Sequence, residues 1–324
     1  MSYQNDTVWK EMQGFLPERN RLTEETMPAE YDLPLLGMRV HIDHYKVARP
    51  KATLILLHGV GGNGRLLSFI AVRLAANGYE VICPDLPLYG HTEYSGKITY
   101  DTWVQCGKAL VAHYREQGAD SIVLFGLSAG GMLAYQVASA CEDVKGIIAT
   151  CILDQRNARV TKETATNPLM AITGKPFLAL VHKPFGKVRL PMKMVTKMKA
   201  LANNAALVKL LLQDKRAAGI SVPISCLHTM LHPTIQTEPE HFQTCPLLLV
   251  HPAADKWTDV SLSRLFYDKL ACEKELRLLD GAGHFPIEEQ GLAQLEGYCL
   301  RFLEHLNLHK PAHLPPEPLD NPLL

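Results

Sequence analysis

The chain has 324 residues, of which 47% are hydrophobic and 20% are charged, and its basic and acidic side chains balance to a formal net charge of +0. This length suits one large α/β domain with an insertion, or two small domains, and the composition is ordinary for a soluble globular protein. The neutral balance gives no case for nucleic-acid binding, and no apolar run approaches the roughly 18 residues that a membrane-spanning helix needs.

Taken in chain order, the hydrophobic pattern predicts short strands that alternate with helices. The first half predicts strands at 38–47, 53–57, 80–83, 121–125 and 146–153 and helices at 66–77, 100–117 and 129–140. The alternation resumes with strands at 246–250 and 274–279 and helices at 261–270 and 291–306. This order is typical of crossover units, so we expect an α/β fold with a mostly parallel central sheet flanked by helices.

The alternation breaks between residues 155 and 240, where several prolines separate short apolar pieces and no clear strand is evident. We interpret this stretch as a mainly helical cap, inserted into an α/β core formed by residues 1–154 and 241–308. It holds 13 Lys and Arg against 4 Asp and Glu, a net charge of about +9. Such a basic, apolar segment suits peripheral contact with an anionic membrane, although a solvated lysine-rich face is the plainer interpretation. Residues 309–324 contain five prolines and predict an extended or disordered tail.

The most informative motif is Gly126-Leu127-Ser128-Ala129-Gly130, which reads G-x-S-x-G between a predicted strand and a predicted helix. Glycines allow a tight turn there, and the turn presents the serine hydroxyl to a base. A serine hydroxyl is a poor nucleophile at neutral pH, so it needs a base that is itself oriented by a carboxylate. The motif therefore predicts a histidine and an acid farther along the chain.

Two later strand ends supply these partners. Strand 246–250 runs into a loop that contains Asp255, and strand 274–279 runs into the Gly-rich loop that contains His284. Because the carboxyl ends of parallel strands meet at one edge of a sheet, we expect both side chains to approach Ser128. Asp259, four residues after Asp255, and Asp154, at the end of an earlier strand, are the alternatives for the acid.

An oxyanion hole is the fourth part of such a site. Strand 53–57 leads into His58-Gly59-Val60-Gly61-Gly62, a turn that can aim a backbone N–H at a developing oxyanion. The N–H of Ala129, directly after the nucleophile, would be the second donor. We expect His58 to brace this turn, and Asp85 to shape its own loop, without taking part in the chemistry.

Together these segments resemble the α/β-hydrolase superfamily, and within it the branch of monoacylglycerol lipases, lysophospholipases and carboxylesterases, which are serine aminopeptidase-like hydrolases. The resemblance is carried by Leu57-His58-Gly59, the stretch CPDLPLYGHT at 83–92, the G-x-S-x-G turn, Asp255 and Gly283-His284. It covers about residues 52–306. One departure is Pro87-Leu88-Tyr89-Gly90, where the family more often has Pro-Gly-His/Tyr-Gly.

The resemblance implies the α/β-hydrolase fold and a role for each site residue. Ser128 would be the nucleophile, His284 the base and Asp255 the acid that orients it. The N–H groups of Val60 and Ala129 would be the oxyanion donors. A serine at position 128 argues against epoxide hydrolase chemistry, for which the resemblance would imply aspartate.

These features predict a serine hydrolase that cleaves a carboxylic ester of a lipophilic acyl group, such as a monoglyceride or a lysophospholipid, through an acyl-enzyme. The first alternative is a lactonase that opens an acyl-lactone, such as an acyl-homoserine lactone, with the same three residues. The alternative from another class is a non-catalytic, ligand-binding homologue. No cofactor is expected.

Histidines and cysteines give no sign of a metal site or of disulfide bonds. His228 and His232 are four residues apart, and His41 and His44 lie near each other, but neither pair belongs to an H-E-x-x-H motif. The eight cysteines are scattered and form no C-x-x-C pair. The first 20 residues carry five charged side chains and no apolar stretch typical of a secretory signal peptide. These features predict a cytoplasmic protein.

Overall fold

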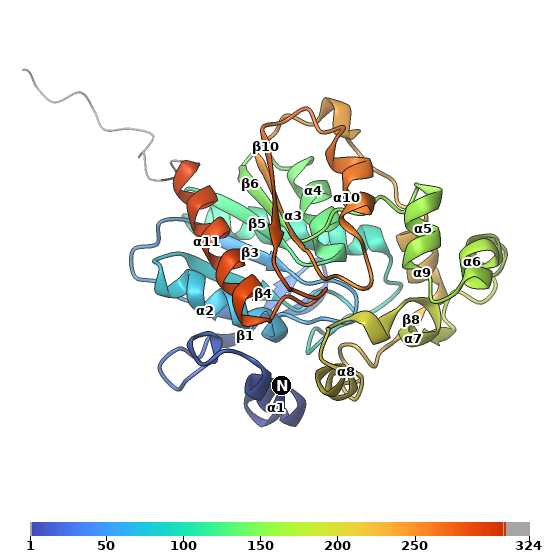
Figure 1. Cartoon of the computed structure of the whole chain (residues 1–324), viewed down its shortest axis with the longest axis horizontal. Helices are drawn as coiled ribbons and strands as arrows, with labels where there is room; N and C mark the ends of the chain where they lie inside the picture. The colour runs from blue at the N-terminus through green and yellow to red at the C-terminus, as the bar shows by residue number, and fades with distance from the viewer. Residues whose placement is uncertain (1, 307, 309–324) are drawn as a thin grey trace, which may run out of the picture.

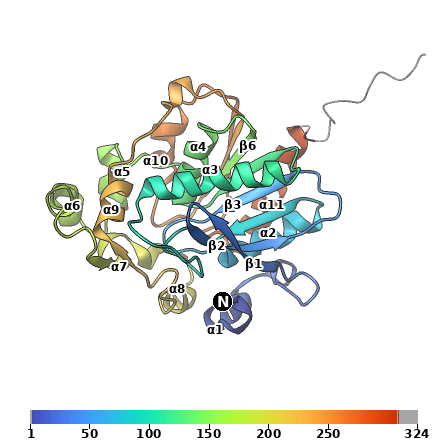
Figure 2. The ribbon, with the colours of Figure 1, turned by 180° about the vertical axis from the view of Figure 1, so that it is seen from behind.

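The centre of the molecule is an eight-stranded sheet with the order β1-β2-β4-β3-β5-β6-β9-β10. The computed structural model describes residues 2–306 and 308, and Figures 1 and 2 show it from opposite sides. The six strands from β4 to β10 in this order run parallel, whereas β2 pairs antiparallel with both β1 and β4. The expected mostly parallel sheet is therefore confirmed. The strands are β1 (Ala29–Leu35), β2 (Met38–Tyr45), β3 (Thr53–Leu57), β4 (Glu80–Pro84), β5 (Ile122–Gly126), β6 (Val144–Ala149), β9 (Leu247–Pro252) and β10 (Lys274–Leu279).

Helices cover both faces of this sheet. Helices α2 and α11 pack together over one face (Figure 1), and α3 and α4 pack together over the other (Figure 2). Phe266 of α10 meets Tyr135 of α4 edge to face, which places α10 beside α4. Because both faces are covered, β3, β5 and β9 are buried along their whole lengths and read as continuous apolar runs. The helices are α2 (Ser68–Ala76), α3 (Tyr100–Glu116), α4 (Ala129–Ala138), α10 (Val260–Tyr267) and α11 (Glu289–His305).

The N-terminal region contains structure that hydrophobic periodicity does not predict. A short helix, α1 (Thr7–Met12), precedes β1, which forms the antiparallel edge of the sheet. Only Leu33 of β1 is fully buried, so this strand lacks the alternation by which a half-buried strand is recognised.

Between β6 and β9 the chain leaves the central sheet and forms mostly helices, which gather at one side of the molecule (Figure 1). The expectation that residues 155–240 contain no strand is wrong, because β7 and β8 form a small antiparallel sheet. Each has only three residues and ends at a proline, which is too short for a periodic pattern. The elements are α5 (Ala158–Thr164), α6 (Pro168–Val181), β7 (Arg189–Pro191), α7 (Met192–Val195), α8 (Ala205–Leu211), β8 (Ser221–Pro223) and α9 (Ile224–Leu231).

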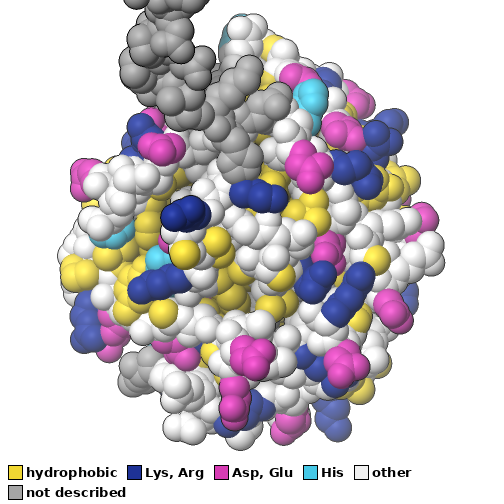
Figure 3. Space-filling model, turned by 90° about the vertical axis from the view of Figure 1, so that its left-hand side faces the viewer, with side chains coloured by type: hydrophobic (Ala, Val, Ile, Leu, Met, Phe, Trp, Pro, Cys, Tyr) yellow, Lys and Arg dark blue, Asp and Glu magenta, His cyan; other side chains and the backbone are white. Residues whose placement is uncertain are grey.

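On the side of the molecule away from α5 to α9, the charged side chains of the surface are not of a single sign. Basic and acidic side chains are mixed there with hydrophobic ones (Figure 3). Within residues 2–306, no helix is long and apolar enough to cross a membrane. The tail expected at residues 309–324 lies outside the described residues.

Candidate active site

Ser128 lies on a sharp turn between β5 and α4. Its φ angle is +56°, a left-handed conformation that is uncommon for a residue with a side chain. The turn packs tightly against the neighbouring strand, because a Cβ on Gly130 would lie 2.0 Å from the carbonyl oxygen of Leu57. The backbone N–H of Ser128 donates to the hydroxyl of Thr150 at 3.0 Å. The local structure is thus the strained elbow that the G-x-S-x-G motif predicts.

The structure brings the three predicted side chains together. The Ser128 hydroxyl lies 2.7 Å from Nε2 of His284, and Nδ1 of His284 lies 2.8 Å from Oδ2 of Asp255. These distances allow Ser128 to donate to the imidazole while the imidazole donates to the carboxylate. His284 is 3% exposed, so the contacts are sheltered from water.

Asp255 is held in its ionised form. Burial alone would raise the pKa of this carboxyl, but its hydrogen bond with His284, the charge of His284 and the hydrogen bonds from Thr258 lower the pKa to about 2. Its second oxygen, Oδ1, accepts the N–H groups of Trp257 and Thr258 at 2.7 and 2.9 Å. A carboxylate fixed in this way can orient a histidine and stabilise its protonated form.

The two alternative acids have other partners. Asp259 caps α10, where its side chain accepts the N–H of Ser261 at 2.8 Å. Asp154 pairs with Arg156 at 2.9 Å. Neither carboxylate contacts His284 among the described residues, so the geometry favours Asp255.

Two residues near the acid were not predicted to matter. The Thr258 hydroxyl donates to Oδ2 of Asp255 at 2.7 Å, and His251 Nε2 donates to the carbonyl oxygen of Thr258 at 2.9 Å. Both contacts depend on how the chain folds back after β9. The sequence therefore offers no spacing signal from which to infer them.

The glycine-rich turn after β3 lies against the elbow. A Cβ on Gly59 would lie 2.7 Å from the Ser128 Cβ and 3.0 Å from the backbone nitrogen of Ala129. Val60 is therefore the next residue in sequence after Gly59, which packs against the elbow. A cavity of about 20 Å³, lined in part by Val60, Ser128 and His284, lies between the two segments. Such a volume admits one water-sized atom.

His58 braces this turn. Its Nδ1 donates to the Gly59 carbonyl oxygen at 2.8 Å, and its Nε2 accepts the N–H of Leu86 at 2.9 Å. The contact at Nε2 requires a neutral ring, and complete burial lowers the pKa of His58 to about 4. The ring thus joins the turn to the loop that follows β4.

We expect His58 to make stability depend on pH. Below its ordinary pKa of 6.5 the unfolded chain binds a proton that the folded protein does not take up until about pH 4. The free energy of unfolding should therefore fall as the pH decreases through this window, with His58 contributing up to about 3 kcal/mol. Urea unfolding of wild type and His58→Gln between about pH 7 and pH 4 measures this, and the wild-type curve should be the steeper one. Parallel curves would contradict a buried neutral His58.

A larger cavity opens beside Ser128. It has a volume of about 450 Å³ and is lined mainly by apolar side chains of the elbow and of the segment between β6 and β9. Those that close it include Met132, Leu178, Met192, Leu227 and Trp257. Among the described residues, Lys175 is the only charged one in the lining, and no aspartate or glutamate lines the cavity.

One group of described residues has the side-chain types of a metal site. These are Glu30, His41 and Asp43. Nη2 of Arg65 lies 2.9 Å from a carboxylate oxygen of Glu30 and 2.9 Å from one of Asp43. A cation would have to bind beside this guanidinium, so the group fits a buried ion-pair network better than a metal site.

The fold and the elbow define an α/β hydrolase. Residues 48–291 match the family model described as "serine aminopeptidase, S33". This match spans about three quarters of the chain, and the chain belongs to this family of α/β hydrolases. A search among curated proteins finds no match in sequence.

Solved structures with this fold include two lipases and a lactonase. A soluble variant of monoglyceride lipase from Saccharomyces cerevisiae, in complex with a substrate analogue, superposes with a TM-score of 0.73 and 16% identity over 90% of this chain and 98% of that chain. The monoacylglycerol lipase of Paleococcus ferrophilus gives 0.65 and 17%, over 82% and 99%. The N-acyl homoserine lactonase AidH, an E219G mutant complexed with N-hexanoyl homoserine, gives 0.62 and 16%, over 88% and 100%. Epoxide hydrolases are also similar in structure. At these identities, the likeness shows the fold alone.

Proposed function

We propose that this protein is a serine hydrolase that cleaves carboxylic esters of lipophilic acyl groups through an acyl-enzyme. The observation that carries the proposal is the chain of contacts from Ser128 through His284 to Asp255, at 2.7 and 2.8 Å. A histidine held in this way can remove the serine proton as the hydroxyl attacks a carbonyl carbon.

In the first half of the reaction, Ser128 Oγ attacks the ester carbonyl and His284 Nε2 takes the serine proton. The N–H groups of Val60 and Ala129 stabilise the resulting oxyanion, a contribution worth roughly 10²–10³-fold in rate per donor. The carbon–oxygen bond to the leaving alcohol then breaks, and His284 gives its proton to that alcohol. In the second half, His284 takes a proton from water, the hydroxide attacks the acyl carbonyl, and the acid is released as Ser128 regains its proton.

The large cavity supports a lipophilic acyl group over a peptide. An aminopeptidase must hold a substrate ammonium group, and a buried charge requires a paired partner. The described lining offers no carboxylate for this purpose and carries one lysine instead. Apolar walls beside the nucleophile favour an alkyl chain. We also propose that the segment 155–240 acts as the cap over this cavity, since its side chains form most of the lining.

A series of esters with increasing acyl length tests the substrate class. Because each buried methylene contributes about 0.8 kcal/mol, kcat/KM should rise about fourfold per methylene until the chain fills the cavity. Acyl-homoserine lactones of matched acyl length, assayed in parallel, decide between an esterase and a lactonase. A flat profile would contradict acyl binding in this cavity. If the folded protein hydrolyses neither series, the non-catalytic alternative is favoured.

We further propose peripheral membrane contact through α6. Its outward side chains Leu169, Ile172 and Leu180 are 69%, 74% and 78% exposed, and the whole segment 155–240 carries 13 Lys and Arg against 4 Asp and Glu. Exposed apolar side chains among basic residues suit an anionic lipid surface. Sedimentation with anionic vesicles should show binding that weakens as salt is added. Equal recovery in the supernatant with and without vesicles would count against this surface.

A further inference from the structure

We infer that Tyr3 is a positioning residue for the oxyanion loop, which we define as residues 58–64. The inference rests on the proposed function, because it matters only if this loop supplies an N–H donor to the reaction. It is carried by contacts that run from the oxyanion loop to the β4 loop (residues 85–91), and from the β4 loop to Tyr3. The partners of Tyr3 in this network, Asp85, Arg65 and Glu30, are far from it in sequence.

The oxyanion loop is attached to the β4 loop at two points. The N–H of Gly64, at its end, donates to Oδ1 of Asp85 at 2.7 Å. The His58 ring, at its start, accepts the N–H of Leu86. Because the loop is held at its start and at its end, the position of its backbone depends on the position of the β4 loop.

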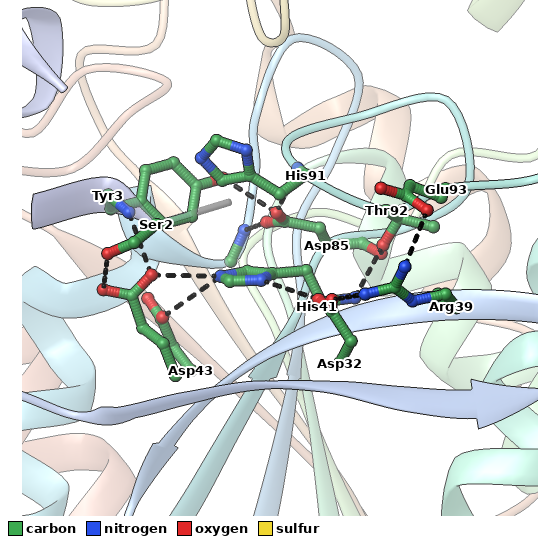
Figure 4. A network of polar contacts seen from close by, with 12 residues as sticks. Ser2, Tyr3, Asp32, Arg39, His41, Asp43, Asp85, His91, Thr92 and Glu93 are labelled. Atoms are coloured by element: carbon green, nitrogen blue, oxygen red, sulfur yellow. Dashed lines mark hydrogen bonds and ion pairs between the residues drawn. The ribbon is translucent and has the colours of Figure 1, made fainter. Parts of the chain in front are cut away.

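Tyr3 holds the carboxylate at the first of these points. Its hydroxyl donates to Oδ2 of Asp85 at 2.8 Å, beside the N–H of His91, which donates to the same oxygen at 2.7 Å (Figure 4). Tyr3 is 1% exposed, so its hydroxyl is shielded from solvent. A Cβ on Gly90 would lie 1.9 Å from Oδ2 of Asp85 and 2.5 Å from the Tyr3 hydroxyl oxygen, so the tyrosine fits only because this residue is glycine.

The aromatic ring of Tyr3 is itself fixed by the residue that follows the oxyanion loop. The Arg65 guanidinium lies over the rings of Tyr3 and Trp9, at 4.8 and 4.7 Å from their centroids. Arg65 also pairs with Glu30, and the Tyr3 N–H donates to the same carboxylate at 2.9 Å. Cation–π and ion-pair contacts in such a buried setting are strong. Tyr3 therefore contacts both Asp85, which binds the end of the oxyanion loop, and Arg65, which directly follows that loop.

The same network reaches the segment between β6 and β9. The N–H of Gly90 donates to the carbonyl oxygen of Arg216 at 2.9 Å, and α1 packs against α8. Residues 1–47 precede the part of the chain that matches the family model, so Tyr3 lies outside the matched residues. The plainer interpretation is that the N-terminal residues only stabilise the fold. The two interpretations differ in what the loss of one hydroxyl does to catalysis.

Tyr3→Phe removes the hydroxyl and leaves the ring over Arg65. An oxyanion loop that is held less firmly stabilises the transition state less, whereas the affinity for substrate in the ground state does not change. We expect kcat for an ester to fall about tenfold, a part of the 10²–10³-fold that loss of an oxyanion donor costs, with KM within about twofold of wild type. Rates are calculated per active enzyme molecule, whose concentration is measured by active-site titration. Circular dichroism checks that the variant is folded.

The matched control is Tyr31→Phe. This tyrosine lies on β1 and its hydroxyl bonds to His44 and Tyr114, away from the β4 loop. Its kcat and KM should match those of wild type. The inference is overturned if Tyr3→Phe keeps the wild-type kcat, if only KM changes, or if Tyr31→Phe loses kcat equally. In each of these cases Ser128-dependent hydrolysis by wild type leaves the proposed function standing. If wild type shows no Ser128-dependent hydrolysis, the proposed function fails and this inference fails with it.

Discussion

Ser128→Ala should lower kcat for ester hydrolysis by about 10⁴- to 10⁶-fold, because this variant lacks the proposed nucleophile. The oxyanion donors and the cavity remain in this variant, so weak residual hydrolysis by water and unchanged substrate binding are expected. Among the described residues the hydroxyl bonds to the His284 side chain, and stability should change little when this contact is lost. Initial rates with a medium-chain ester, together with a thermal unfolding curve, measure both effects.

Ser139→Ala is the matched control for this substitution. Ser139 lies at the other end of the helix that Ser128 begins, and its hydroxyl donates to the Tyr135 carbonyl oxygen at 2.8 Å. The same change of side chain there should leave kcat within about twofold of wild type, as expected for a substitution away from the reacting atoms. Comparable activity in Ser128→Ala and in wild type would remove Ser128 as the nucleophile.

Asp255→Asn should lower kcat by about 10⁴-fold, because an amide can donate to the histidine and so favour the wrong tautomer. In the proposed mechanism the carboxylate also stabilises the imidazolium, and the lowered pKa of Asp255 favours the charged form that this role needs. KM should change much less than kcat, since Asp255 lies behind His284 and is out of reach of the substrate. Steady-state kinetics at neutral pH measure the changes in kcat and KM separately.

Asp259→Asn controls for the loss of a nearby carboxylate. Asp259 caps α10, and asparagine is an equally good cap, so both stability and kcat should stay near their wild-type values. If Asp259→Asn were the variant that lost activity, the acid would have been assigned to the wrong residue. This pair of variants therefore decides between two carboxylates that the sequence alone leaves as alternatives.

The sequence predicts those parts of the molecule whose signal is local. Strand Thr53–Leu57 has its expected bounds because a fully buried parallel strand is a short apolar run between breaks. Ser128 is recognisable because the tight elbow needs glycines at fixed offsets. Asp255 and His284 follow from the rule that parallel strands end at the same edge.

Other parts depend on contacts between residues that are distant in sequence. Tyr3 and Asp85 are 82 residues apart, and no spacing or composition links them. Thr258 reaches Asp255 only because the loop after β9 turns back on itself. The three-residue strands β7 and β8 are stabilised by each other, with no period of their own. Such features follow from packing that a single sequence does not display.

Labelling with a fluorophosphonate, followed by peptide mass spectrometry, tests the central claim most directly. The reagent phosphonylates a serine only where a base and an oxyanion hole activate it. We predict one adduct per chain on Ser128, and no adduct in the folded His284→Ala variant. An unlabelled but folded wild-type protein, or an adduct on any residue other than Ser128, would contradict the account.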